Sequence, residues 1–286
     1  MTSPNEPDIE EPLDVVRLHK QYKDGRIHLA EAIIAAKVVS VGATGIYVEH
    51  QRLFWASVLF TRLIVTACSI LRLAPRVEPP EPDANWDFSA LGSIVRNIAE
   101  CYFVFFYLCA EDVADDDEWA TRQNLVQLRD NKTRWKMFLD FDIDPDQEAG
   151  FAGHHADLTA RLKGRRHFQG LREKRQVELL KGDKDPFTQD EILDRMGTDR
   201  ATFRGYYRYL CSHTHTGPIS FYRMAEHDRG RGIENPRDKG SMGTAMGFAS
   251  DFLKRATEDM IRLFPNAQER GQQAFGNRHA RRRNKT

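Results

Sequence analysis

The sequence predicts an all-α protein, a helical bundle that carries a polar helical insertion. Apolar residues recur at helical spacing along most of the chain, and no stretch alternates apolar and polar residues as a half-buried strand does. No Asn-Gly turn marks a β-hairpin. Apolar residues make up 41% of the chain and charged residues 29%, a composition typical of a globular protein that buries a core.

The first helical region is expected to run from Arg26 through the apolar stretch 46–73, with an interruption near Gly42 and Gly45. Residues 1–25, which include the acidic "NEPDIEEPLD", are predicted to be a disordered N-terminus. Pro75 ends the helical region. The following "RVEPPEPDAN" is predicted to be a loop, because proline lacks the N–H that a helix interior needs.

Two helices are predicted before the middle of the chain. Asn85 or Asp87 can cap the first, and its apolar run reaches Leu108. The second is expected to start near Asp116, because acidic side chains favour the positive end of the helix dipole.

The polar insertion, 144–200, belongs to a single helical domain that is expected to span 26–265. We expect two exposed helices and a loop in it, because its polar residues outnumber the apolar ones. A short helix should close the insertion, with a threonine cap at Thr188 and a glycine stop at Gly197.

Two more helices follow the insertion. Thr198 or Asp199 can open the first, which should stop at Gly217, and the second should cover about 243–263. Residues 266–286 end in "NRHARRRNKT" and are predicted to form a basic flexible tail.

Charge and cysteine patterns favour a cytoplasmic protein that does not enter the membrane. Lys plus Arg and Asp plus Glu number 42 each, and the four cysteines show no CxxC spacing. Nothing at the N-terminus resembles a signal peptide. The run 53–71 is long enough to cross a bilayer, but Arg62 at its centre would cost roughly 2.5–3.5 kcal/mol there.

The segment "YYRYLCSHTHTGP" concentrates the candidate chemistry. Arg208 and His215 lie seven residues apart, close to two helical turns, and Ser212 lies on the same side of the helix. His213 points roughly 140° away from Arg208, at ~100° per residue. The guanidinium can bind a phosphate, and an imidazole can move a proton near neutral pH.

The same segment also fits an ordinary helix end. A histidine before Gly-Pro can hydrogen-bond the last helix carbonyls, and tyrosines can pack with their polar tips outward. The alternative function is therefore a non-catalytic helical binding or interaction protein in which these residues are structural.

Arg208 followed by His213 or by His215 resembles the arginine-then-histidine pattern of HEPN proteins. The segments "LCSHTHTGP" and "RNIAECYFVFFYL" also resemble an uncharacterised bacterial helical family with an Arg-x-x-x-Glu and a Ser-x-x-His motif. The HEPN resemblance implies a four- or five-helix bundle and a metal-independent ribonuclease. It also implies a homodimer with a composite site, no cofactor, and a role in toxin–antitoxin or phage-defence systems with an antitoxin-like partner.

A second group of charges lies among apolar residues. Arg96 and Glu100 are four residues apart on one predicted helix, and Arg62 lies on another apolar helix. We expect the two helices to be neighbours and at least one of the arginines to be buried against Glu100, because an unpaired buried charge is costly. These residues either form a structural ion-pair network or complete a polar pocket beside Arg208.

The candidate site residues fall into two sets, the catalytic Arg208, His215 and Ser212 and the binding Arg62, Arg96, Glu100, His213 and Tyr207. RNA is the expected ligand, attracted by the basic run "KGRRHFQGLREKRQ" (163–176) and the tail. No metal site is expected, because the adjacent His154 and His155 diverge on a helix and no ligand partner follows at helical spacing.

Overall fold

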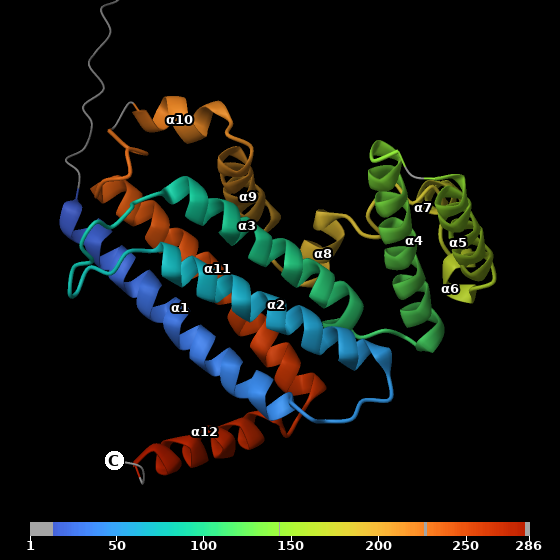
Figure 1. Cartoon of the computed structure of the whole chain (residues 1–286), viewed down its shortest axis with the longest axis horizontal. Helices are drawn as coiled ribbons and strands as arrows, with labels where there is room; N and C mark the ends of the chain where they lie inside the picture. Colours follow the sequence, from blue (N-terminus) through green and yellow to red (C-terminus); the bar gives the residue numbers. More distant parts are fainter. Residues whose placement is uncertain (1–13, 143, 226–227, 284–286) are drawn as a thin grey trace, which may run out of the picture. The chain divides into compact units, whose positions relative to one another are not determined.

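The computed structural model describes residues 14–142, 144–225 and 228–283, and every secondary-structure element in those ranges is helical (Figure 1). The all-α prediction is confirmed. The elements are α1 (Val15–Ala43), α2 (Gln51–Leu73), α3 (Phe88–Phe105), a π-helical turn (Phe106–Ala110), α4 (Asp116–Asp140), α5 (Pro145–Lys163), α6 (Arg166–Gln169), α7 (Glu173–Leu180), α8 (Gln189–Arg195), α9 (Arg200–Thr214), α10 (Pro218–Ala225), α11 (Pro236–Leu263) and α12 (Ala267–Arg283).

The chain divides into two compact units. The first unit comprises Met1–Ile34, Val65–Ile98 and Arg208–Leu253, and the second comprises Ala35–Ile64, Ala99–Tyr207 and Lys254–Thr286. Within the described ranges, five long helices contribute residues to both units: α1, α2, α3, α9 and α11.

The first unit is held together by close packing of α1 on α11. The two helices touch backbone to backbone at Gly25 and Gly243, where a Cβ on Gly25 would lie 2.5 Å from the Gly243 carbonyl oxygen. The Tyr22 hydroxyl donates a 2.6 Å hydrogen bond to the Pro75 carbonyl, which ties α1 to the end of α2. The fully buried side chains of this unit include Tyr22, Leu29, Ile70, Phe88, Leu91, Leu210 and Met246.

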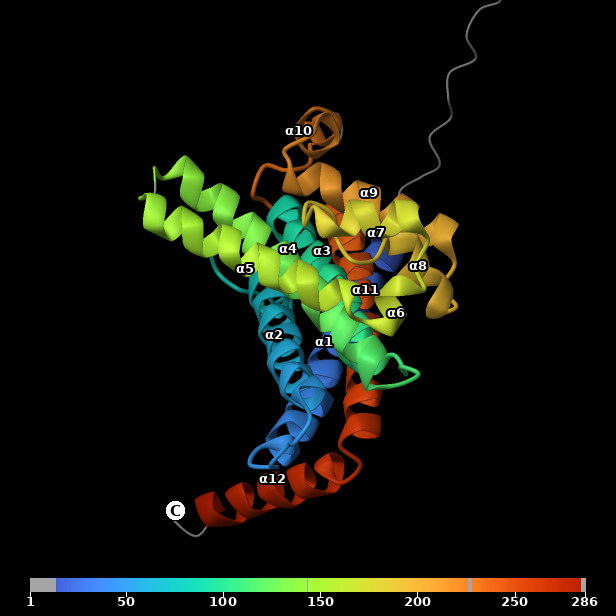
Figure 2. The ribbon, with the colours of Figure 1, turned by 90° about the vertical axis from the view of Figure 1, so that its right-hand side faces the viewer.

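The second unit contains the insertion, in which α5 packs along α4 (Figures 1 and 2). A small apolar core joins α4, α5, α6 and α7, built from Leu125, Leu128, Leu158, Leu162, Phe168 and Leu179. The insertion was expected to hold two exposed helices, a loop and a short closing helix. The closing helix is α8, but the part before it folds into α5, α6 and α7, whose apolar residues join those of α4 in a core.

The C-terminal segment differs from the expected flexible tail. Residues 267–283 form α12, and its Gly271 packs so closely on α1 that a Cβ there would overlap the Val38 carbonyl. Gly42 of α1 makes the reciprocal contact with Ala267. Small residues on both helices allow this approach, which the polar sequence of the tail does not reveal.

The start of α1 also differs from the expectation. The helix begins at Val15, so the described part of the predicted disordered N-terminus, 14–25, is largely helical. Residues 1–13 of that prediction lie outside the described residues. The predicted interruption is confirmed at Gly45, which takes a positive φ of 74° between α1 and α2, whereas Gly42 lies within α1.

The predicted helix starts are confirmed where a capping side chain is present. Asp115 accepts a hydrogen bond from the Glu118 N–H at the start of α4, and Thr188 with Glu191 forms a capping box on α8. Asp199 accepts from two backbone N–H groups of α9. The last long helix begins earlier than predicted, with Pro236 in the first turn of α11, where proline costs no hydrogen bond.

Candidate functional site

Helix α9 carries the candidate catalytic residues at its C-terminal end. Its last turn closes with a 2.8 Å hydrogen bond from the Gly217 N–H to the Ser212 carbonyl, and Thr216 takes a left-handed φ of 49°. This is a Schellman-type end. The His215 N–H still donates to the Cys211 carbonyl at 3.1 Å, so His215 keeps the helical register although α9 ends at Thr214.

Arg208 and His215 are both exposed, two turns apart on the same edge of α9. No ion pair joins either side chain to a described residue. The Ser212 hydroxyl lies between them but donates to the Arg208 carbonyl at 3.0 Å. The Ser212 hydroxyl thus donates to the helix backbone and not to Arg208 or His215, and its orienting role stays a prediction.

His213 lies on the opposite side of α9 and is 4% exposed. Its Nδ1 lies 2.9 Å from the Ser89 Oγ, and the edges of the imidazole meet the rings of Phe88 and Tyr209 at centroid distances of 4.7 and 4.8 Å. Its Nε2 is buried without a hydrogen-bond partner among the described residues. The predicted binding role is not supported, since a ligand cannot reach this ring without opening the packing.

The environment keeps His213 neutral. Burial lowers the pKa of its imidazole to about 4, and the nearby Arg229 guanidinium acts in the same direction. Arg229 donates a 2.7 Å hydrogen bond to Asp238, a residue that is 1% exposed. Burial works against the charge on Arg229, but Asp238 and Tyr209 raise the pKa of its guanidinium above the usual value. The pattern around His213 is therefore that of a structural core histidine.

Glu100 and Tyr207, two of the predicted binding residues, do lie together in the second unit. The Tyr207 hydroxyl donates a 2.6 Å hydrogen bond to a Glu100 carboxylate oxygen. Both residues line a pocket of about 360 Å³ with Phe103 and Phe187. The sequence placed Glu100 in an ion-pair network and did not reveal this contact with Tyr207.

At least one of Arg62 and Arg96 was expected to be buried against Glu100, and neither is fully buried. Arg62 is exposed, and Arg96 is only half-buried. Arg62 lies on the outward face of α2, in line with the exposed Val58 and Val65. The apolar residues around Arg62 in the sequence do not enclose it, because a helix buries only one of its faces.

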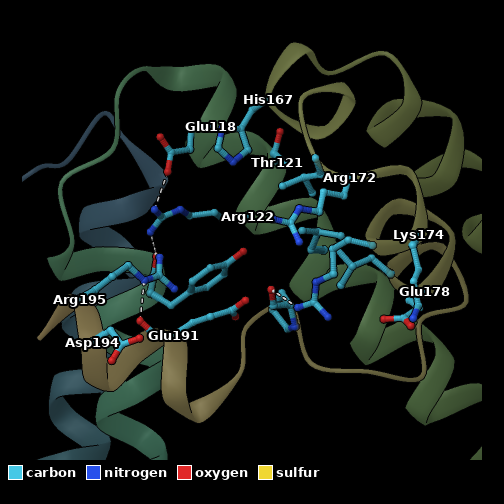
Figure 3. Close-up of a pocket in the computed structure, with 16 residues that line it drawn as sticks. Glu118, Thr121, Arg122, His167, Arg172, Lys174, Glu178, Glu191, Asp194 and Arg195 are labelled. Carbon is cyan, nitrogen blue, oxygen red and sulfur yellow. Dashed lines mark hydrogen bonds and ion pairs between the residues drawn. The ribbon is translucent and has the colours of Figure 1, made fainter. Parts of the chain in front are cut away.

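A second candidate site, not predicted as a pocket, lies in the second unit between α4 and the insertion (Figure 3). We call this cavity of about 810 Å³ the insertion pocket; α4, α6, α7 and α8 line it together with Tyr107 of the π-helical turn. The signal in the sequence was the basic run 163–176, which contributes His167, Arg172, Lys174 and Arg175 to the lining.

Arg122 anchors one wall of the insertion pocket. It is 6% exposed and donates to Glu111 at 2.6 Å and to the Tyr107 carbonyl at 2.7 Å, and it pairs with Glu118 one turn earlier on α4. Arg195 of α8 also pairs with Glu111 at 2.8 Å. Burial works to raise the pKa of the Glu118 carboxyl, but hydrogen bonds from the Ala114 N–H and Arg122 outweigh it, so that pKa is lowered.

Arg172 and Lys174 lie on the other side of the pocket from Arg122 and Arg195 (Figure 3). Neither has an ion-pair partner in the part of the chain that the structure describes. The same part contains no group of three His, Cys, Asp or Glu side chains arranged to hold a metal ion.

The comparisons with known proteins give one match. The model of a family of unknown function, DUF5677, matches residues 53–233, which is more than half of the chain and includes every predicted site residue. No curated protein and no solved structure matches the chain.

Proposed function

We propose that the chain, a member of this family of unknown function, is a metal-independent ribonuclease of HEPN-like type. Arg208 would bind the scissile phosphate and His215 would act as a general acid or base. The observation that carries the proposal is that both side chains are exposed on one edge of α9, where a substrate can reach them.

The reaction needs no cofactor. Attack of a 2′-hydroxyl on the adjacent phosphorus breaks the bond to the 5′ oxygen and leaves a 2′,3′-cyclic phosphate and a 5′-hydroxyl. The His215 imidazole would take the proton from the 2′-hydroxyl or give one to the leaving oxygen. The Arg208 guanidinium would offset the negative charge that grows on the phosphate oxygens.

Helix α10, which follows the site directly, supports single-stranded RNA as the substrate. Phe221 and Tyr222 are 56% and 62% exposed, and the Arg223 guanidinium lies 5.7 Å from the centre of the Tyr222 ring. Exposed aromatic rings stack on unpaired bases, and arginine side chains contact the phosphates. The proposal includes a cytoplasmic homodimer in a toxin or phage-defence system, with an antitoxin-like protein as its partner.

Purified protein incubated with mixed single-stranded RNA tests the assignment. Arg208→Ala and His215→Ala should each slow cleavage by roughly 10²–10⁴-fold, the usual effect of removing a general acid or base or a comparable charged group. A chelator should leave the wild-type rate unchanged. Arg161→Ala and His154→Ala are matched controls, because both residues are exposed on α5, outside the site.

Two results would reject the proposal. Cleavage that persists in both α9 variants would assign the activity to another site or to a contaminant. A wild type that cleaves no RNA, with α9 variants that melt at lower temperature, would favour the non-catalytic interaction protein in which these residues are structural.

A further inference from the structure

We propose that the insertion pocket binds a phosphomonoester with an apolar body, held at its phosphate by Arg172, Lys174 and Arg175. This site lies in the second unit, uses none of the α9 residues and does not depend on the proposed RNA cleavage.

The carboxylates that line the pocket have hydrogen-bond or ion-pair partners, whereas three of the lining cations have no ion-pair partner in the described part of the chain. Each lining carboxylate already has a partner: Glu118 pairs with Arg122, Glu178 with Lys184 and Asp194 with Arg200, while Glu191 accepts from the Thr188 N–H. Two of these partners, Lys184 and Arg200, lie outside the pocket lining. None of these four carboxylates therefore pairs with Arg172, Lys174 or Arg175.

The cations on the α7 side are not engaged in the same way. Among the described residues, no carboxylate lies within ion-pair distance of Arg172, Lys174 or Arg175. Arg175 makes one hydrogen bond, from its guanidinium to the Pro186 carbonyl at 3.1 Å. Three positive side chains from four consecutive residues thus line one pocket without an ion pair to a described carboxylate. Arg172 and Lys174 are exposed, so an anion that enters the pocket can reach them and accept charge-assisted hydrogen bonds.

On the opposite wall the arginines are already paired, so this wall favours an apolar group over an anion. Arg122 and Arg195 are bridged by Glu111, which leaves their charge compensated. Tyr107 and Leu125, from the π-helical turn and α4, also line the pocket. A cavity of about 810 Å³ is within the usual size range of a small-ligand site. The ligand therefore needs an apolar body against this wall and its charge toward α7.

The number of cations favours a phosphomonoester over a carboxylate. A phosphomonoester carries a charge of about −1.5 to −2 at neutral pH and has three acceptor oxygens. A carboxylate carries one charge, which a single arginine can match in a bidentate pair. Arg172 and Lys174 both lie on the side away from Arg122, with Glu178 labelled beside Lys174 (Figure 3).

Isothermal titration calorimetry with phenyl phosphate tests the site directly. Wild-type protein should bind phenyl phosphate more tightly than inorganic phosphate, benzoate or phenol. Arg172→Ala and Lys174→Ala should each weaken binding by about tenfold or more, the size expected for a charge-assisted hydrogen bond. Arg161→Ala is the matched control, because Arg161 is an exposed arginine of the insertion that does not line the pocket, and it should bind as the wild type does.

The source of the phosphomonoester is resolved by competition. Displacement of phenyl phosphate by a 5′-phosphorylated RNA, but not by the same RNA with a 5′-hydroxyl, would identify an RNA end as the ligand. If neither RNA displaces phenyl phosphate, the ligand is a small phosphomonoester and not an RNA end. Absence of phenyl phosphate binding, equal binding of phenol, or unchanged binding in both Arg172→Ala and Lys174→Ala with wild-type melting temperatures would overturn the assignment.

Discussion

His213 is buried as a neutral imidazole between Phe88 and Tyr209, with Ser89 on one ring nitrogen. Ser89 comes from a helix more than a hundred residues away in the chain, so no local pattern links it to His213. The arrangement resembles a serine–histidine pair, but burial lowers the pKa of His213 to about 4 and no described group forms a hydrogen bond with its Nε2. Such a histidine makes stability depend on pH.

The pH dependence can be predicted with its sign. In the unfolded state the His213 imidazole has an ordinary pKa near 6.5 and is protonated below that pH. In the folded state it stays neutral until the pH approaches about 4. The contribution of the neutral His213 to the free energy of unfolding is therefore complete above the unfolded pKa and is lost as the pH falls. His213 should remove about 2 kcal/mol from the free energy of unfolding between about pH 7 and about pH 5.

Urea unfolding of the wild type and of His213→Asn at both pH values measures this contribution. The amide oxygen of asparagine can accept from Ser89 as Nδ1 does, but the side chain does not titrate. The variant should be less stable at neutral pH because a cavity remains, yet its stability should fall less on acidification. An equal fall in both proteins would show that His213 does not carry this pH dependence.

At the scale of the element, glycines decide how closely the helices approach. Gly25 of α1 and Gly243 of α11 face one another, and a Cβ on Gly243 would lie 2.6 Å from the Gln21 carbonyl oxygen. Backbone atoms cannot move aside as a flexible side chain can. In the sequence these glycines resemble the other helical glycines, which weaken a helix, and nothing local marks their role.

Gly25→Ala and Gly243→Ala should each lower the free energy of unfolding by about 1–3 kcal/mol, because the added methyl group pushes α1 and α11 apart. Gly247→Ala is the matched control on α11, since no atom lies within 4 Å of a Cβ there. That change should stabilise the protein by about 0.5–1 kcal/mol, because alanine favours the helix. Chemical denaturation measures all three. Stabilisation by the two contact variants would contradict the close packing.

At the scale of the whole molecule, the described residues include two helical stretches long and apolar enough to cross a membrane, Gln51–Leu73 and Phe88–Ala110. In the second, 61% of the apolar window is buried, as in the core helix of a soluble protein. In α2 the figure is 33%, and Phe54, Val58 and Val65 are exposed on one face. Arg62 interrupts that face near its middle, where a bilayer would make its charge costly.

We therefore expect untagged protein to remain in the aqueous fraction after the membranes are sedimented. Sedimentation velocity of that fraction tests the proposed homodimer, which should have twice the 33.0 kDa mass of one chain. Arg62→Leu should shift part of the protein to the membrane pellet, because it makes the exposed face of α2 continuous. Recovery of the wild type only after detergent extraction would contradict this prediction.

Periodicity and capping residues determined which segments are helical. Thr188 and Asp199 cap their helices as predicted, because a cap acts on N–H groups two or three residues away, and α4 starts at Asp116 as predicted. The side of α9 that carries Arg208 and His215 also followed from helical geometry alone. Local patterns suffice where the interaction partners are close in sequence.

Only the tertiary structure decided which polar residues are buried and which polar residues of different helices contact one another. It left Arg62 exposed, placed His213 against Ser89, and joined Glu100 to Tyr207. It also converted a basic run into the wall of a pocket and a polar tail into α12. These outcomes depend on contacts between residues far apart in the chain, and the helical pattern of one segment does not specify which face another helix will cover.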